Sequence, residues 1–203
     1  MPTRFAPLSD PDMTPEQRRV AHAVASGPRG GLRGPFHALL RSPELAARVR
    51  LLGDFVRFES AIPASLRELA ILLVARFWSA DYEWHAHRSH AVTAGLDPAI
   101  PAAIETGRRP AALSPDEILV YDLISELLTD RDISDATYEA AKNRFGERAI
   151  VELIGTLGTT VSCRWCSTPR VCRCRKAALA CLHWGRSRSA AAWPRSTGRG
   201  CTI

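Results

Sequence analysis

The chain has 203 residues and a formal net charge of +6, and its length favours one domain with a core of its own. The sequence pI near 9.3 suggests an acidic partner such as nucleic acid, but the positions of the charges argue against one. Nine of the 27 basic side chains and all six cysteines lie in residues 163–203, which contain no Asp or Glu. Residues 1–162 therefore hold 18 basic and 21 acidic side chains, a net charge of −3, and no cysteine.

Membrane and secretory classes are not indicated. No apolar run approaches the ~18 to 20 residues that a membrane-spanning helix needs. The first five residues, Met1 to Phe5, lack the charged segment and apolar core of a signal peptide. We therefore expect a cytoplasmic protein without a membrane partner.

Helix-start signals recur along residues 1–162, whereas the alternation typical of strands is almost absent. Thr14 and Ser114 each open a capping box, and Gly95 is placed to end a helix. We expect an all-α fold, a compact bundle of about seven to eight helices with antiparallel neighbours, followed by an irregular C-terminal tail. The expected helices begin near Thr14, Ser42, Ser65, Asp81, Asp97, Ser114, Ser134 and Glu147, and the last one ends at about Val161.

One loop, residues 27–35, is rich in Gly, Arg and Pro. A phosphate-binding loop is one interpretation of it. The segment follows no strand and lacks the Gly-Lys-Ser/Thr ending of such loops, so we expect a plain connection.

Most of the reactive side chains lie between Glu68 and His90. On the helix after Asp81, the spacing of Glu83, His87 and His90 places the three on one face, while His85 points elsewhere. Glu68 lies among apolar residues of the preceding helix, and an antiparallel pair of helices would bring it against His87. A carboxylate that holds an imidazole in one tautomer makes a general acid or base.

Three alternatives remain open for this cluster. Glu68 could form an ion pair with Arg76 instead, and His85 or His90 could be solvated surface groups. Glu83, His87 and His90 could also offer a metal one carboxylate and two imidazoles, although the spacing lacks the His-Glu-x-x-His form of zinc proteases. We expect no metal.

Three segments of this region carry a resemblance. Residues 67–72 (RELAIL), residues 82–87 (YEWHAH) and the Ala94-Gly95-Leu96 ending resemble the core motif of the carboxymuconolactone decarboxylase family, which includes the alkylhydroperoxidase D-like proteins. Glu83 lies fifteen positions after Glu68, His87 four positions after Glu83, and Gly95 eight positions after His87. The resemblance covers roughly residues 5–162 and implies an alkylhydroperoxidase D-like helical domain over residues 1–162.

The resemblance also implies a homotrimer or a hexamer with its site near a subunit interface. Peroxidase members of the family place a Cys-x-x-Cys pair before the motif histidine, which here corresponds to Ala80 and Glu83. Neither residue can attack a peroxide or resolve a sulfenic acid. The peroxidase alternative is therefore disfavoured.

With the peroxidase members disfavoured, the resemblance implies the decarboxylase members of the family. These act on a small carboxylated lactone and need no organic cofactor. In this interpretation His87 donates the proton, Glu68 orients it, and Glu83 is a further catalytic candidate. Arg76 is a candidate for binding the substrate carboxylate, because a guanidinium grips carboxylates in a bidentate way. The remaining candidates for substrate contacts are His85, Tyr82 and Trp84.

Residues 163–203 admit two interpretations. Cys163, Cys166, Cys172, Cys174 and His183 suggest a zinc site, and the arginines suggest nucleic acid. The Arg, Ala, Cys and Ser bias instead resembles GC-rich DNA translated out of frame, and suitable synonymous codons in a shifted frame encode an apolar helix end with a Pro-containing finish. We favour a frameshift near Thr159 to Arg164, a disordered tail and no nucleic-acid partner.

Overall fold

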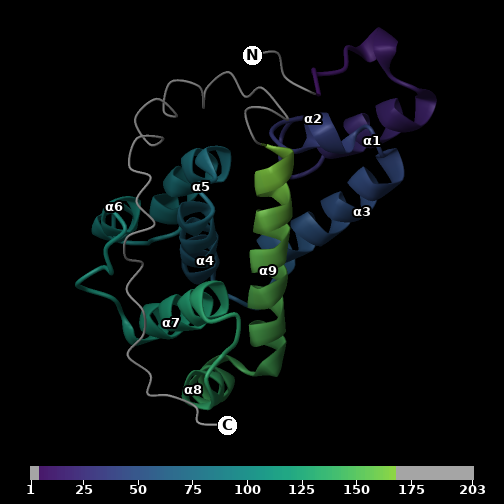
Figure 1. Ribbon diagram of the computed structural model, residues 1–203. Coiled ribbons are helices and arrows are strands. Elements are labelled where there is room, and N and C mark those ends of the chain that lie inside the picture. The colour runs from purple at the N-terminus through teal and green to yellow at the C-terminus, as the bar shows by residue number, and fades with distance from the viewer. Residues whose placement is uncertain (1–4, 168–203) are drawn as a thin grey trace.

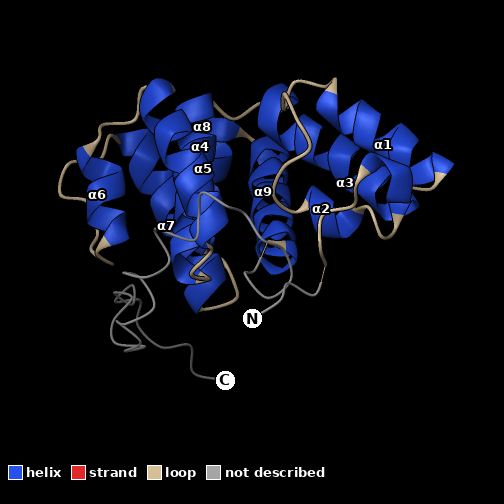
Figure 2. Ribbon diagram, turned by 90° about the horizontal axis from the view of Figure 1, so that it is seen from above, coloured by secondary structure: helices blue, strands red, loops and turns tan. Residues whose placement is uncertain are grey.

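A computed structural model describes residues 5–167 of the chain, and within that range the protein consists of helices and connecting loops (Figures 1 and 2). This confirms the all-α fold class. The elements are η1 (Asp10–Asp12), α1 (Pro15–Ala25), α2 (Phe36–Leu39), α3 (Pro43–Asp54), the π-helical turn η2 (Phe55–Glu59), α4 (Ala64–Phe77), α5 (Asp81–Thr93), α6 (Ala99–Glu105), α7 (Pro115–Thr129), α8 (Asp135–Phe145) and α9 (Glu147–Cys166).

Helix ends fall where the polar signals of the sequence place them. The side chains of Thr14 and Ser114 accept hydrogen bonds from the third helical N–H of α1 and α7, which belong to Gln17 and Glu117. The Gln17 and Glu117 side chains in turn accept hydrogen bonds from the backbone N–H of Thr14 and Ser114, so both capping boxes are complete. After α5 the chain turns at Gly95, whose φ of +97° is one that glycine adopts readily.

Helix α4 is the centre of the larger core. Its residues Leu69, Leu72 and Leu73 are fully buried, and it packs against α5, α7 and α9 (Figure 1). A helix that is apolar on nearly every side must be enclosed by other elements. The neighbouring helices therefore assemble around α4.

A second, smaller cluster lies between α1, α2 and α3, with Val24, Leu40 and Ala46 at its centre. Helix α9 stands between this cluster and the larger one in both views (Figures 1 and 2). Leu153 of α9 belongs to the larger core, while Cys166 at its end packs against the smaller cluster. One helix thus joins the two halves of the fold.

The end of α9 corrects one expectation. The helix continues to Cys166 rather than ending at about Val161, so the first residues assigned to the irregular tail are helical. The extension is held by contacts to the end of α4: the Arg164 Nε donates to the Trp78 carbonyl at 2.8 Å, and the Trp165 ring lies edge-on to that of Trp78. The expected disorder and the proposed zinc ligands Cys172, Cys174 and His183 lie outside the described residues.

A buried carboxylate fixes the segment between η2 and α4. Glu152 of α9 is 7 % exposed and accepts hydrogen bonds from the Ser60 hydroxyl at 2.8 Å and the Ala61 N–H at 2.7 Å. The Arg148 guanidinium donates to its other oxygen at 2.7 Å. Glu152 therefore holds the residues that follow η2 against α9.

Among residues 5–167, no helix is both long enough and apolar enough to cross a membrane.

Substitution of Glu152 tests this junction. Glu152→Ala leaves the Ser60 hydroxyl and the Ala61 N–H without their acceptor, so we expect the free energy of unfolding to fall by about 1–3 kcal/mol. Urea denaturation measures the change. Glu139→Ala, which removes an exposed carboxylate of α8, is the matched control and should change stability by less than about 0.5 kcal/mol. Equal stability of the two variants would contradict the proposed role of Glu152.

Candidate active site

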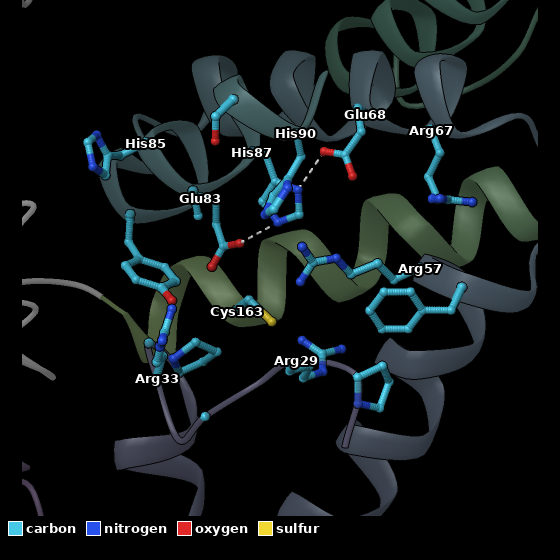
Figure 3. A pocket seen from close by; sticks show the side chains of 18 of the residues that line it. Arg29, Arg33, Arg57, Arg67, Glu68, Glu83, His85, His87, His90 and Cys163 are labelled. Atoms are coloured by element: carbon cyan, nitrogen blue, oxygen red, sulfur yellow. Dashed lines mark hydrogen bonds and ion pairs between the residues drawn. The ribbon is translucent and has the colours of Figure 1, made fainter. Parts of the chain in front are cut away.

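A cavity of about 860 Å³ opens between α4, α5, η2, the end of α9 and the loop that precedes α2 (Figure 3). Its size is in the range of small-molecule binding sites. Glu68, Glu83, His87 and His90 lie along one side, and Arg29 and Arg33 lie on the opposite side. The cavity is thus acidic and imidazole-lined on one side and basic on the other.

Glu68 and His87 form a buried pair. The His87 Nδ1 lies 2.7 Å from the Glu68 Oε2, and the two side chains are 11 % and 5 % exposed. The contact expected from the sequence is therefore present. Burial alone would raise the pKa of Glu68, but the hydrogen bond and charge of His87, with the charges of Arg57 and His90, bring that pKa below its ordinary value. Glu68 is thus held as a carboxylate that accepts the Nδ1–H of His87.

Glu83 is placed on the other side of the same imidazole. Its Oε2 lies 3.6 Å from the His87 Nε2, beyond normal hydrogen-bond length, and its Oε1 is buried without a hydrogen-bond partner among the described residues. Burial raises the pKa of Glu83 despite the opposing charges of His87, Arg29 and Arg57. The neutral form of Glu83 therefore persists to a higher pH than that of an exposed glutamate, and in that form it can donate a hydrogen bond into the cavity.

The other motif residues of α5 divide between the cavity and the core. His90 and Tyr82 line the cavity, and the His90 ring lies 5.9 Å from that of His87. His85 also borders the cavity, but it is exposed and its ring points away from Glu83 and His87, as its helical spacing predicts (Figure 3). Trp84 instead belongs to the buried core and is not among the lining residues.

Arg76 is also outside the cavity lining. Its Nε donates a hydrogen bond to the Glu105 carbonyl at the end of α6, at 3.1 Å. Glu68 pairs with His87 rather than with Arg76. The sequence hypothesis that Arg76 binds a substrate carboxylate therefore finds no support in its position.

Four arginines of the cavity were not among the sequence candidates. Arg29 and Arg33 come from the loop of residues 27–35, Arg57 from η2 and Arg67 from α4. The loop is the connection expected, yet it also forms a wall of the cavity. The only sequence signal for this role was the presence of two arginines in a Gly- and Pro-rich segment.

Close packing explains a glycine in this wall. Gly34 has φ +58°, and a Cβ atom at this position would collide with the Tyr82 ring. The glycine therefore lets the loop backbone lie directly against α5.

One cysteine, Cys163 of α9, also lines the cavity. Burial, with a smaller contribution from the charge of Glu83, raises the pKa of its thiol. A thiol that stays protonated is a poor nucleophile. Within residues 5–167, no group of three or more His, Cys, Asp or Glu side chains is arranged to hold a metal ion.

Comparison with known proteins leaves the family open. No protein-family model matches the chain, and no curated protein and no solved structure matches it. The assignment of a function therefore depends on the geometry of the cavity and on its chemistry.

The Glu68–His87 pair predicts a pH dependence. Because its folded-state pKa is lowered, Glu68 stabilises the fold fully above its ordinary pKa of 4.5, and this contribution is lost as the pH falls through the lowered pKa. His87→Leu removes the partner and leaves the burial, so we expect the pKa of Glu68 to rise above its ordinary value.

Carboxyl ¹³C NMR against pH measures this titration in both proteins. The Glu68 titration of the unaltered protein serves as the reference. An unchanged Glu68 titration in His87→Leu would show that the imidazole does not set it.

Proposed function

We propose that the protein is an enzyme that transfers a proton at a carbon atom of a small carboxylated lactone, with decarboxylation as the first candidate reaction. The observation that carries the proposal is the buried Glu68–His87 pair in a cavity of suitable size, with the His87 Nε2 3.6 Å from Glu83, whose pKa burial raises. The resemblance of residues 67–96 to the carboxymuconolactone decarboxylase family supports the same reaction class.

The chemistry sets two requirements. In a lactone whose carboxylate is conjugated to the ring carbonyl through a double bond, cleavage of the C–CO₂ bond leaves its electron pair as a dienolate. The protein must stabilise the negative oxygen of this dienolate and return a proton to carbon. Both steps use ordinary side chains, and no organic cofactor is required.

The side chains of the cavity fit these two roles. Protonated His87 donates its Nε2 proton to the carbon, and the Glu68 carboxylate stabilises the imidazolium and fixes its orientation. Glu83, in its neutral form, donates a hydrogen bond from the carboxyl group to the dienolate oxygen. Two carboxyl groups whose pKa values move in opposite directions thus take two different roles.

Thiol-based peroxide reduction is the second hypothesis, and no observation favours it. Ala80 and Glu83 occupy the positions of the required cysteines, and burial raises the pKa of the thiol that does line the cavity, Cys163. A trimeric or hexameric assembly and a cytoplasmic location remain predictions.

Turnover of a panel of carboxylated lactones, γ-carboxymuconolactone among them, tests the proposal. We expect His87→Ala to lower kcat by at least about 100-fold, because it removes the proton donor. Loss of lactone absorbance and release of carbon dioxide report the reaction. His22→Ala, an exposed histidine of α1, should leave turnover unchanged. Equal turnover by His87→Ala and the unaltered protein would remove His87 from the mechanism.

A further inference from the structure

The structure points to a residue that selects the charge of the substrate. Arg57 lies in η2, the five-residue π-helical turn between α3 and α4. Its guanidinium extends into the cavity toward His87 and Glu83 (Figure 3). Such π-helical turns are rare and are often found at functional sites, because the wider turn changes the direction of its side chains.

The partners of the cavity arginines differ. The Arg29 Nε lies 2.7 Å from the Asp54 carboxylate, and Arg50 binds the other oxygen of that carboxylate at 3.0 Å. Arg57, in contrast, makes neither a hydrogen bond nor an ion pair with any of residues 5–167. Its Cζ lies 5.3 Å from the centroid of the Phe58 ring, and its charge contributes to lowering the pKa of Glu68. A half-buried guanidinium without a hydrogen-bonded anion has donors available for a ligand.

Further observations indicate that the ligand is an anion. The Arg67 Nε is buried in the same cavity without a hydrogen-bond partner among the described residues. Asp54 is one carboxylate shared by two guanidinium groups, so it leaves a positive charge uncompensated. Burial raises the pKa of Glu83, and in its neutral form this residue does not repel an anion placed beside it.

We propose that Arg57 binds a carboxylate group of the substrate next to the Glu68–His87 pair and thereby restricts the site to anionic ligands. This inference rests on the proposed function in taking a carboxylated lactone as the ligand. It transfers to Arg57 the role that the sequence suggests for Arg76. The planar guanidinium binds a carboxylate through two parallel hydrogen bonds, which fixes the ring as well as attracting its charge.

The position of Arg57 depends on the junction at Glu152. Residues Ser60 and Ala61, which follow η2 directly, are bound to the Glu152 carboxylate of α9. The end of the π-helical turn is thus held to the helix that also supplies Cys163 to the cavity. Arg57 is therefore presented from an anchored segment.

Calorimetric titration of the full chain tests the proposal with a matched pair of probes. A butenolide that carries a carboxymethyl group supplies the anion, and its methyl ester is the neutral analogue of nearly the same shape. We expect the unaltered protein to prefer the acid. Arg57→Gln should lose on the order of 10-fold or more in affinity for the acid, with little change for the ester. Arg57→Lys should lose less affinity for the acid, because lysine keeps the positive charge although it cannot form the two parallel hydrogen bonds of a guanidinium.

The control is Arg48→Gln, an exposed arginine of α3 paired with Glu44, which should bind both probes as the unaltered protein does. Thermal unfolding checks that each variant is folded. Equal affinity of the unaltered protein for acid and ester, an acid affinity unchanged in Arg57→Gln, or an equal loss for both probes would overturn the role of Arg57. Binding of the acid without turnover of any lactone would contradict the proposed reaction and leave the assignment of Arg57 intact.

Discussion

Enclosure of α4 is the constraint on which the rest of the structure depends. A helix with leucines on nearly every side must bury all of them, and α5, α7 and α9 surround it to do so. Glu68 is part of the same helix and is buried with it. Burial removes its carboxylate from water, which costs free energy unless a partner binds the charge. The Nδ1 of His87 supplies the compensating hydrogen bond. The packing of α4 against α5 and the central pair of the candidate site are therefore one arrangement.

The same burial acts differently on the two carboxyl groups. Glu68 has an imidazole within hydrogen-bond distance and keeps its charge, whereas Glu83 has only a distant Nε2 and a buried oxygen without a partner. The imidazole between them thus has the Glu68 carboxylate on one side and, on the other, a carboxyl group whose pKa burial raises. The two glutamates thus differ in their distance to His87, which is 2.7 Å for Glu68 and 3.6 Å for Glu83. This difference separates the roles of the two residues.

The sequence predicts those parts of the structure that follow from helical periodicity and end signals. The meeting of Glu68 and His87 is one of them, because two short-linked antiparallel helices bring matching faces together. Arg57 could not be predicted, since a π-helical turn breaks the 3.6-residue period by which side-chain direction is assigned. The loop arginines have no periodicity at all, and their place in the cavity depends on long-range packing against Tyr82. Arg76 follows the helical pattern, but the end of α6 provides it with a carbonyl partner outside the cavity.

The end of helix α9 contributes to the cavity and to the packing of the fold, a structural role that the Arg- and Cys-rich composition of the C-terminal region does not suggest. The interval of the proposed frameshift, Thr159 to Arg164, includes Cys163, which lines the cavity, and directly precedes the turn with Cys166, which packs on the smaller cluster. A change of frame there would replace a wall of the cavity and a contact between the two halves of the fold. A shortened chain that ends at Val161 would therefore lack a residue of the cavity wall and the contact that Cys166 makes with the smaller cluster. The nucleotide sequence of this short stretch thus bears on the shape of the cavity.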